Sequence, residues 1–431
     1  MFHKQTIEDI DIAGKTVLVR VDYNVPLKDG LITDDYRIQK SLPTIQYLLD
    51  KECKIVLCSH LGRPTGPEDK ACSLAVTGKR LGEMLQTNVQ FVTDCVSDEA
   101  KQKTSQLQSR EILLLENLRF YKEEEANNDD FARRLAEGAE VFVQDGFGVV
   151  HRAHASTEAI TRHIHSVAGF LVASEVSAIT SVMEQPERPL MALIGGAKIS
   201  DKIDLLHRFI DIADIVAVGG AMANTFLVAN GHEIGRSLHD PDDVPLAKEI
   251  MDKARQKSRE SRFIFYVPQD GVVAEDMEHP KSTRIVDWGT HAIADIESYP
   301  KNPPREASIV QPQEKILDIG PFSGAFIAGS MQLASTVIWN GAMGVTEIAG
   351  IQHKLGPFSH GTELVMEAML GQFGHRPKTV VGGGDTVGYI EDRKLVDMFD
   401  HVSTGGGASM ELMSGKQLPG VEALANKEHQ G

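Results

Sequence analysis

Short apolar runs rich in β-branched residues recur along the chain, and each ends in polar residues or glycines. In the first part of the chain they cover residues 16–21, 54–58, 111–115 and 140–143. In the later part they cover residues 190–194, 215–218, 336–339, 379–381 and 401–402. Stretches with helical spacing, such as 131–138 and 201–212, lie between them. Alternating strands and helices predict an α/β fold with doubly wound parallel sheets, whose strands are covered by helices on both faces.

A helix is predicted where the two groups of strands meet. In residues 170–184, Val172, Val176, Ile179 and Met183 are spaced by four, three and four positions and share one helical face. Prolines at 186 and 189 follow and end the helix. The pattern predicts two domains, residues 1–169 and 186–403, joined by a helix over 170–185. Residues 296–315 contain four prolines without a clear period and predict a long surface loop.

The charge of the chain narrows the range of its partners. Its 431 residues hold 44 Lys and Arg against 61 Asp and Glu, a formal charge of −17. Such a surface repels nucleic acid and anionic membranes, and no run of 18 apolar residues indicates a membrane span. We therefore expect small-molecule partners, and a local cationic cluster wherever an anion binds.

The compartment is predicted from the cysteines and the start of the chain. The four cysteines form no CxxC pair, which is typical of reduced thiols in a cytosolic protein rather than of a zinc site. Residues 1–10 lack the apolar segment of a secretory signal. A cytoplasmic location is the expectation.

Charged residues follow the strands of the first half. The cationic ones are Arg37, His60, Arg63, Arg119 and Arg152. Ligands of open α/β sheets bind beyond the carboxyl ends of the strands, so these side chains are expected to converge. Guanidinium groups match carboxylate and phosphate oxygens, while Asp22 and Asn24 are placed to accept from a hydroxyl. This half therefore predicts a site for one small, strongly anionic molecule. The alternative for Arg37 is a surface ion pair, since it follows Asp34 and Asp35.

Glycine turns follow the strands of the second half. They lie at residues 195–198, 219–222, 382–386 and 405–409. Backbone N–H groups at such strand-to-helix turns bind anions, and glycine lets phosphate approach the main chain closely. Four such turns, one containing Lys198 and one containing Asp385, indicate a polyphosphate with a divalent cation. Asp385 suits Mg²⁺, which takes one or two carboxylates together with phosphate oxygens.

Two further local patterns give structural expectations. Lys198 and Lys202 are four residues apart, which predicts one face of a helix that starts near Ser200. The alternative is a solvated ion pair with Asp201 or Asp204. The acidic run at 123–125, just before a predicted helix, predicts a solvated capping segment rather than a metal site.

Other catalytic and phosphate motifs are missing or incomplete. No GxxxxGK[ST] motif occurs, which excludes a Walker-type phosphate loop. Residues 382–384 with Gly388 resemble a dinucleotide fingerprint only loosely. That feature keeps an NAD-dependent two-domain dehydrogenase as a second hypothesis. A third is a catalytically silent phosphometabolite-binding protein that uses the arginines alone. No Ser/His/Asp or Cys/His arrangement indicates nucleophilic catalysis.

A set of ordered motifs carries a resemblance to a known family. The motifs are VRVDYNVP at 19–26, SHLGRP at 59–64, ENLRF at 116–120, HRAH at 151–154, GGAKISDK at 195–202, DIGP at 318–321, WNG at 339–341, GGGDT at 382–386 and STGGGAS at 403–409. Over essentially its whole length the chain closely resembles the phosphoglycerate kinase family. Four positions depart from the family pattern, namely Gln144, Gly146, Ala221 and Ala342. None of them removes a substrate arginine or a phosphate ligand.

The resemblance implies the fold and the reaction. Two Rossmann-like domains would be joined by the helix, with residues 404–431 returning to the first domain. The enzyme would transfer a phosphoryl group reversibly between 1,3-bisphosphoglycerate and MgADP, giving 3-phosphoglycerate and MgATP, in glycolysis and gluconeogenesis. Mg²⁺ would be the cofactor and ATP or ADP the co-substrate of a cytoplasmic monomer whose domains close. In the direction from ATP the nucleophile is a carboxylate that is already ionised at neutral pH, so no general base is needed.

The resemblance also assigns site residues. The 3-phosphoglycerate positions are Asp22, Tyr23, Asn24, Arg37, His60, Leu61, Gly62, Arg63, Arg119 and Arg152. The nucleotide positions are Lys198, Lys202, Gly219, Gly220, Asn340, Glu347, Gly383, Gly384, Asp385 and Thr386. Glu347 would hold the ribose hydroxyls and Asp385 the Mg²⁺. We expect Arg37, Lys198 and the turns that contain Gly384 and Gly407 to contact the transferred group, because charge develops on its oxygens.

Overall fold

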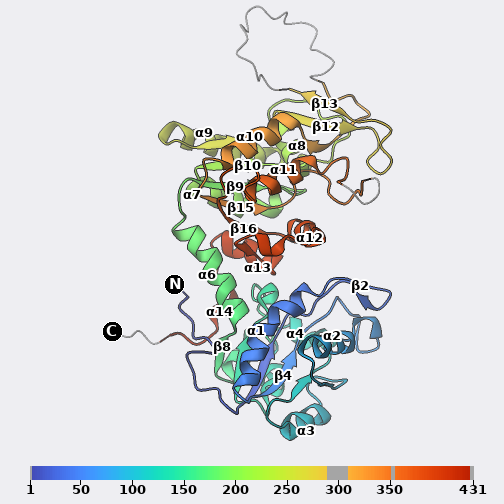
Figure 1. The fold of residues 1–431 in the computed structure, drawn as a ribbon, viewed down its shortest axis with the longest axis vertical. Helices are drawn as coiled ribbons and strands as arrows, with labels where there is room; N and C mark the ends of the chain where they lie inside the picture. The colour runs from blue at the N-terminus through green and yellow to red at the C-terminus, as the bar shows by residue number, and fades with distance from the viewer. Residues whose placement is uncertain (1, 289–308, 351–354, 428–431) are drawn as a thin grey trace, which may run out of the picture. The chain divides into compact units, whose positions relative to one another are not determined.

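A computed structural model describes residues 2–288, 309–350 and 355–427. Its backbone divides into two compact units (Figure 1). Unit 1 comprises Met1–Thr180 and Thr404–Gly431, and unit 2 comprises Ser181–Ser403. Most of the loop expected over 296–315 lies outside the described residues. Within those residues, every helix is too short or too polar to cross a membrane.

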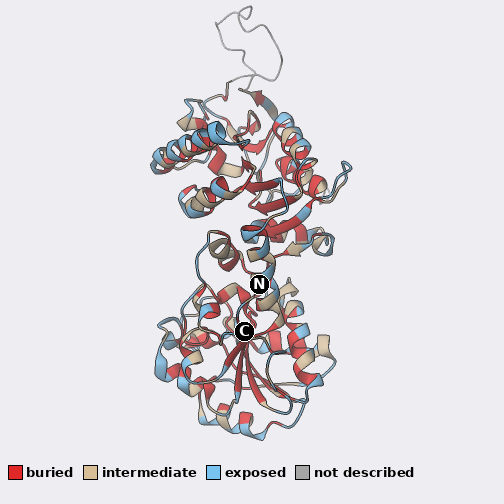
Figure 2. Cartoon of the chain, turned by 90° about the vertical axis from the view of Figure 1, so that its left-hand side faces the viewer, coloured by how far each residue is buried: buried red, intermediate tan, exposed pale blue. Residues whose placement is uncertain are grey.

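Unit 1 is built on a six-stranded parallel sheet. In spatial order its strands are β5 (Val89–Phe91), β6 (Ile112–Leu114), β4 (Lys54–Cys58), β1 (Thr16–Arg20), β7 (Val141–Gln144) and β8 (Ser166–Ala168). All five residues of β1 are buried. Figure 2 shows the buried sheet with exposed positions on the outer sides of the helices. Burial on both faces explains the nearly continuous apolar runs of the sequence.

Two hydrophobic clusters cover the two faces of this sheet. Val17 and Val19 belong to one cluster together with helices α1 (Tyr36–Asp50) and α2 (Ala75–Leu85). Leu18 belongs to the other, with α3 (Asp98–Gln106) and α5 (Asp129–Ala136). Successive side chains of a strand point to opposite faces of the sheet. Because both sets are apolar here, helices cover both faces, as in a doubly wound sheet. Further elements are β2 (Leu27–Lys28), β3 (Leu31–Ile32) and α4 (Lys122–Glu125).

The end of the described chain belongs to unit 1, in agreement with the predicted fold class. It carries α13 (Gly406–Met413) and α14 (Pro419–Glu422). The Ala425 N–H donates to Ser166 O at the start of β8 over 2.9 Å. Lys4 and Asn426 form an isolated antiparallel bridge. Main-chain hydrogen bonds therefore fasten this segment to the sheet and to the start of the chain.

Unit 2 holds a second six-stranded parallel sheet and a smaller antiparallel one. The parallel sheet has the order β11 (Ile264–Tyr266), β10 (Ile215–Val218), β9 (Leu190–Ile194), β15 (Thr336–Asn340), β16 (Lys378–Gly382) and β17 (His401–Val402). The antiparallel sheet has the order β13 (Arg284–Asp287), β12 (Asp270–Ala274) and β14 (Lys315–Ile319). The hydrophobic pattern of the sequence did not predict the antiparallel sheet or the short strands β5, β8 and β11.

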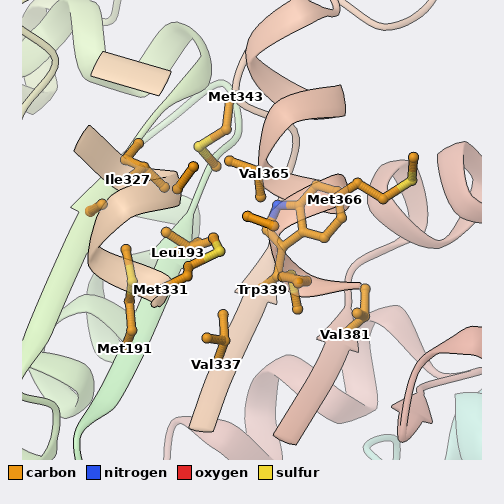
Figure 3. Close-up of a cluster of buried hydrophobic side chains, with 14 of the residues drawn as sticks. Met191, Leu193, Ile327, Met331, Val337, Trp339, Met343, Val365, Met366 and Val381 are labelled. Carbon is orange, nitrogen blue, oxygen red and sulfur yellow. The ribbon is translucent and has the colours of Figure 1, made fainter. Parts of the chain in front are cut away.

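In the described part of unit 2, six helices pack against its sheets, on central strands such as β9 and on outer strands such as β11. They are α7 (Ile203–Ile212), α8 (Gly220–Ala229), α9 (Val244–Glu260), α10 (Pro321–Met331), α11 (His360–Met369) and α12 (Gly384–Asp392). One hydrophobic cluster joins Leu193 and the fully buried Trp339 on the sheet to Met331 of α10 and Val365 of α11 (Figure 3). This packing fixes the strand ends from which the glycine turns leave.

The helix predicted between the two groups of strands is present. It is α6 (Phe170–Glu184), and the division between the units falls inside it, after Thr180. Its first turn is held from unit 1: the Leu171 N–H donates to Asp145 Oδ1 over 2.9 Å. A carboxylate at a helix N-terminus satisfies free N–H groups there. Burial raises the pKa of Asp145 to about 7.

Candidate active site

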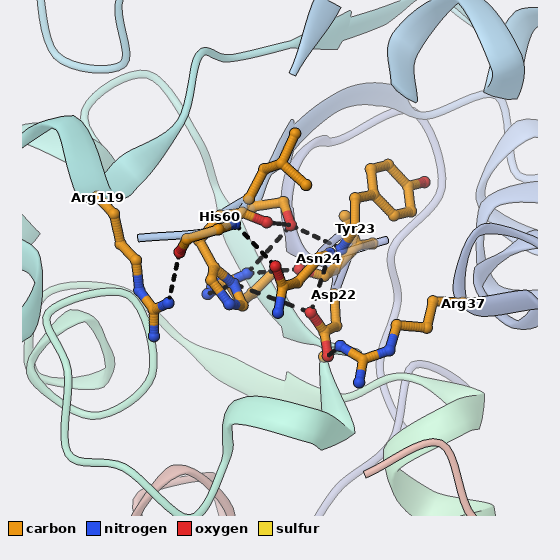
Figure 4. Close-up of polar contacts among 12 residues, drawn as sticks. Asp22, Tyr23, Asn24, Arg37, His60 and Arg119 are labelled. Atoms are coloured by element: carbon orange, nitrogen blue, oxygen red, sulfur yellow. Dashed lines mark hydrogen bonds and ion pairs between the residues drawn. The ribbon is translucent and has the colours of Figure 1, made fainter. Parts of the chain in front are cut away.

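The charged residues of unit 1 converge at one edge of its sheet. Asp22 follows β1, His60 follows β4, and Arg119 lies in the 3₁₀ turn Leu118–Phe120 that follows β6. These three strands are parallel neighbours in the order β6, β4, β1, so their carboxyl ends meet at the same edge. Figure 4 shows Arg37 pointing toward Asp22, with Arg119 on the other side of the group. The predicted convergence of Arg37, His60 and Arg119 is therefore seen.

Arg37 pairs with Asp22 and not with its neighbours in sequence. Arg37 Nη1 lies 2.7 Å from Asp22 Oδ2, whereas Asp35 pairs with Arg80. Asp22 is only 7% exposed. Burial opposes its ionisation, but the charges of Arg37 and Arg20 and a hydrogen bond from the Asn24 N–H outweigh that effect and hold the pKa of Asp22 below its ordinary value. The surface ion pair considered as an alternative for Arg37 is thus not formed.

Arg20 is a functional candidate that the sequence did not reveal. It ends β1 and is 1% exposed. Its Nε donates to Ser156 Oγ over 2.8 Å, and Ser156 Oγ donates to Glu124 Oε1 over 2.6 Å. Glu124 is 1% exposed, so the solvated segment predicted for 123–125 is wrong at this position. A charge inside an apolar run was the one available signal.

Arg20 also determines the state of His60. Arg20 Nη2 lies 3.3 Å from His60 Nδ1. A guanidinium group only donates hydrogen bonds, so Nδ1 accepts and the proton of the neutral imidazole is on Nε2. Burial lowers the pKa of His60 well below its ordinary value, and the charges of Arg20, Arg119 and Arg37 lower it further. His60 is therefore a neutral donor through Nε2.

The loop after β4 is held by residues from two other strand ends. Asn24 Oδ1 accepts from Gly62 N over 2.8 Å, and Arg119 Nη1 donates to Gly62 O over 2.8 Å. Gly62 has a φ of +64°, which glycine adopts without strain. Leu61 is buried, with its N–H and carbonyl on the Asn117 side chain. These hydrogen bonds preorganise the loop. Asn24 therefore has a structural role in holding Gly62, in addition to the ligand-binding role that was predicted for it.

Three predicted residues direct their side chains away from this hydrogen-bonded group, although the Tyr23 N–H donates to Ser59 Oγ within it over 2.8 Å. Tyr23 is fully buried, and its hydroxyl lies 3.0 Å from Ser41 Oγ in the core. Its side chain is therefore structural. Arg63 and Arg152 are exposed, and Arg152 Nε donates to His151 Nε2 over 3.2 Å. Burial, aided by Arg152, lowers the pKa of His151 to about 4.

Two glycines leave room around the cluster. A Cβ on Gly148 would lie 2.2 Å from Asp22 Oδ2 and 3.8 Å from the Cα of Gly405. A Cβ on Gly407 would lie 3.0 Å from His151 Nε2. The turn at 405–407 thus packs beside the Asp22 cluster within unit 1, although it resembles the glycine turns of unit 2.

The glycine turns of unit 2 border a cavity of about 470 Å³. It lies at the carboxyl ends of the parallel strands, and its lining includes Gly196, Gly220, Ala342, Glu347 and Asp385. Helices α8 and α12 begin beside it at Gly220 and Gly384. Free N–H groups and the helix dipole favour an anion at such ends. The turns also pack on one another: a Cβ on Gly220 would lie 2.8 Å from Gly196 N.

The two lysines of the first glycine turn have different environments. Lys202 Nζ donates to Gly195 O over 2.7 Å and to Asn340 Oδ1 over 2.6 Å. Burial lowers the pKa of Lys202 to about 8. Lys198 is exposed, and its Nζ lies 2.8 Å from Asp240 Oδ2. The prediction that both share one helical face is wrong, because the 3₁₀ turn Ser200–Lys202 precedes α7.

The remaining nucleotide positions divide into buried and exposed groups. Asn340 and Thr386 are buried, and Thr386 Oγ1 accepts from Gly341 N over 2.7 Å. Gly383, with a φ of +92°, would place a Cβ 3.3 Å from Asn340 Oδ1. Gly219 caps α8. Glu347 and Asp385 are exposed. No three His, Cys, Asp or Glu side chains form a metal cluster in the part of the chain that the structure describes.

Comparison with known proteins decides between the hypotheses. The family model for phosphoglycerate kinase matches residues 7–416. The chain belongs to the phosphoglycerate kinase family. The phosphoglycerate kinase of Dictyoglomus turgidum is 42% identical over 427 residues, which cover 98% of this chain and 100% of that protein. The phosphoglycerate kinase of Roseiflexus sp. is 44% identical over 423 residues, which cover 98% of this chain and 99% of that protein.

Solved structures of the family agree. Phosphoglycerate kinase from Coxiella burnetii matches with a TM-score of 0.81 and 34% identity, over 97% of this chain and 98% of that chain. The enzyme from Pyrococcus horikoshii matches with a TM-score of 0.79 and 28% identity, over 98% of both chains. This chain is therefore a glycolytic phosphotransferase with a carboxyl group as acceptor and ATP or ADP as co-substrate. The comparisons do not support the dehydrogenase or the silent binding protein.

Proposed function

We propose that the Asp22 cluster of unit 1 binds 3-phosphoglycerate and that the cavity of unit 2 binds MgATP or MgADP. The single observation that carries the first half is the meeting of Asp22, Arg37, His60 and Arg119 at one sheet edge. Their cationic groups complement the carboxylate and phosphate of the substrate. Arg63 and Arg152 complete the set from exposed positions. In this assignment residues 1–169 and 404–431 form the substrate domain, residues 170–185 the connecting helix and residues 186–403 the nucleotide domain.

The chemistry follows from the charges. The acceptor is an ionised carboxylate, so the enzyme positions the reactants and neutralises charge on the transferring group. We assign this neutralisation to Arg37 and Lys198, with backbone N–H groups of the turns at Gly384 and Gly407. His60, a neutral donor through Nε2, orients the substrate. The transfer is direct and in line. A coupled assay with 3-phosphoglycerate and MgATP tests the proposal, and absence of turnover would refute it.

Asp385 fits a Mg²⁺ ligand. It is exposed in the first turn of α12 and lines the cavity. One carboxylate together with nucleotide phosphates is a usual Mg²⁺ set. When bound, the ion would neutralise charge on those phosphates. Asp385→Ala is expected to raise the Mg²⁺ concentration that half-maximal activity requires. An unaltered Mg²⁺ dependence, measured in the coupled assay, would remove Asp385 from this role.

Lys202 gives nucleotide binding a pH dependence. Its pKa of about 8 means that its charge falls above that pH, so MgADP affinity is expected to decline from about pH 8 upward, approaching tenfold per pH unit. Calorimetry between about pH 7 and 9 measures this decline. Lys202→Met is expected to bind weakly with a flat profile. A flat wild-type profile would contradict the assignment.

The effect of Lys202 on stability has the opposite sign. The unfolded chain holds this proton up to a pKa of 10.5, and the folded chain only to about 8. The unfolded state therefore binds more protons between these values, and the Lys202 contribution to folding stability rises with pH there.

Gly148 offers a steric test of the substrate site. In Gly148→Ala the new Cβ would lie 2.2 Å from Asp22 Oδ2. This clash would displace the Asp22 carboxylate from Arg37. We expect the KM for 3-phosphoglycerate to rise about 10- to 100-fold. Gly329→Ala is the matched control, because a Cβ there meets nothing within 4 Å. An unchanged KM in Gly148→Ala would show that Asp22 does not order the site.

The proposal includes closure of the two domains. The substrate residues belong to unit 1 and the nucleotide residues to unit 2, so transfer requires both ligands to be brought together, and closure would exclude water from the acyl phosphate. Small-angle scattering with both ligands should show compaction, and unchanged dimensions at saturation would count against closure. We further propose that the protein is a monomer in the cytoplasm. Sedimentation of the purified chain tests the assembly state, and cell fractionation tests the compartment.

A further inference from the structure

The first glycine turn of unit 2, residues 195–202, is held by a carboxylate from a distant part of the chain. Asp243 ends the 3₁₀ turn Pro241–Asp243 and is 4% exposed. Its Oδ2 accepts from the N–H groups of Ile199 and Ser200 over 2.9 and 3.0 Å, and from Ser200 Oγ over 3.1 Å. These two residues directly follow Lys198. Three hydrogen bonds therefore fix the backbone next to that lysine.

The direction of the Asp243 side chain is unusual for its position. Asp243 is the N-cap residue of α9, where an aspartate ordinarily accepts from the N–H groups of its own first turn. Its side chain makes no such cap bond. The carboxylate contacts residues 43 and 44 positions earlier instead. Helix α9 therefore lacks this stabilising cap, and Asp243 serves the glycine turn.

Asp243 also occupies donors that a phosphate could use. Free N–H groups at the start of a helix bind anions, and the sequence predicts this role for the glycine turn. The N–H groups of Ile199 and Ser200 are already paired with the Asp243 carboxylate. At these two positions the turn offers no free donor. Lys198, which precedes them, is exposed.

The segment that carries Asp243 also contacts the Lys198 side chain. Lys198 Nζ lies 2.8 Å from Asp240 Oδ2. The hydrogen bond and the charge of Asp240 raise the pKa of Lys198 above its ordinary value. Asp240 is itself held, because its Oδ1 accepts from Asp242 N over 3.1 Å. Asp240 therefore keeps Lys198 charged, while Asp243 fixes the backbone from which that side chain extends.

We propose that Asp243 is a positioning residue for phosphoryl transfer, because it fixes the backbone that aims Lys198 at the transferring group. This inference rests on the proposed function, which assigns Lys198 to the charge on that group. Such charge stabilisation depends on preorganised donors, and a displacement of about 1 Å can cost about 10²-fold in rate. Asp243 touches no reactant in this account and acts through Lys198.

Kinetics and calorimetry of Asp243→Ala measure this effect. We expect kcat to fall about 10- to 100-fold, while the affinity for MgADP, which lacks the transferred group, stays within about threefold of wild type. The stoichiometry of MgADP binding gives the folded fraction, so kcat is counted per folded site. Asp243→Asn keeps one oxygen acceptor and should lose less. Asp242→Ala, the matched control, removes an exposed carboxylate one residue away and should behave as the wild type.

A double-mutant cycle separates positioning from a structural role. In a Lys198→Ala background, loss of Asp243 should lower kcat by no more than about twofold, because the lysine that it positions is gone. The same factor in both backgrounds, or a wild-type kcat in Asp243→Ala, would overturn the inference alone. If Lys198→Ala itself keeps the wild-type kcat, the proposed role of Lys198 fails and the inference fails with it.

A crystal structure of the wild type with MgADP bound decides the matter even if both Asp243 variants fail to fold. The three hydrogen bonds from Ile199 and Ser200 to Asp243 should persist in that complex. A phosphate oxygen on either of these N–H groups, with the Asp243 carboxylate displaced, would overturn the inference.

Discussion

Replacement of Arg37 by alanine is expected to lower kcat about 10²- to 10³-fold, with only a modest loss of 3-phosphoglycerate affinity. The reason is the division of labour in the cluster. Other cationic groups hold the bound substrate, whereas we assign the Arg37 guanidinium to the charge that develops on the transferring phosphoryl group. Its position 2.7 Å from Asp22 Oδ2 fixes its direction. Steady-state kinetics in both substrates separate kcat from KM.

The Arg37 experiment needs a control for simple loss of charge. Arg80→Ala removes another arginine of unit 1, which pairs with Asp35 and Glu83 and is 41% exposed, and it should leave kcat within a few-fold of wild type. Because loss of Arg37 raises the pKa of Asp22, both variants are compared well above the ordinary range for aspartate. An unchanged kcat in Arg37→Ala would refute its catalytic role.

Arg20→Met is expected to destabilise the protein by about 3–5 kcal/mol at neutral pH. Arg20 and Glu124 are joined by Ser156, whose hydroxyl accepts from Arg20 and donates to Glu124. The substitution therefore leaves Glu124, which is 1% exposed, without this nearby cation. Burial already raises the pKa of Glu124, and Arg20 acts against that rise. In Arg20→Met the folded state therefore favours protonated Glu124 more strongly. The loss of stability should shrink as pH falls, because protonation removes the unpaired charge.

Denaturation by urea at two pH values measures this loss. Arg162→Met is the matched control, since Arg162 is 51% exposed and pairs with Glu158 on the surface; its effect should stay within about 1 kcal/mol. The two substitutions remove the same charge, so a difference between them reports burial. A loss in Arg20→Met that equals the control, or that grows at low pH, would contradict the buried network.

The sequence predicts where the site lies better than how its members pair. Neighbouring parallel strands that are followed by Asp22, His60 and Arg119 bring these residues to one edge of the sheet. The partner of Arg37 depends on how α1 packs on the sheet. The surface ion pair with Asp34 or Asp35, which was inferred from proximity in the sequence, is therefore not the one that forms. The bond from Arg20 to Ser156 spans 136 positions, and local pattern carries no information on such a contact.

Local departures from regular geometry account for the other misses. The spacing of Lys198 and Lys202 assumes one continuous helix, but Lys202 has a φ of −129° and a 3₁₀ turn intervenes. Strands β5, β8 and β11 each have three residues, too few to show a period. The antiparallel sheet of unit 2 depends on pairing between distant segments. The glycine turns could be predicted from the sequence, because the close backbone packing at these strand-to-helix turns leaves no room for a Cβ at several of these positions.

A crystal structure of the protein with 3-phosphoglycerate bound would show most directly whether the Asp22 cluster is the substrate site. We expect the carboxylate and phosphate oxygens of the ligand to lie within hydrogen-bond distance of Arg37, His60, Arg119 and Arg152, at the carboxyl ends of β1, β4 and β6. A ligand bound elsewhere, or one in this place with those side chains turned away from it, would refute this assignment.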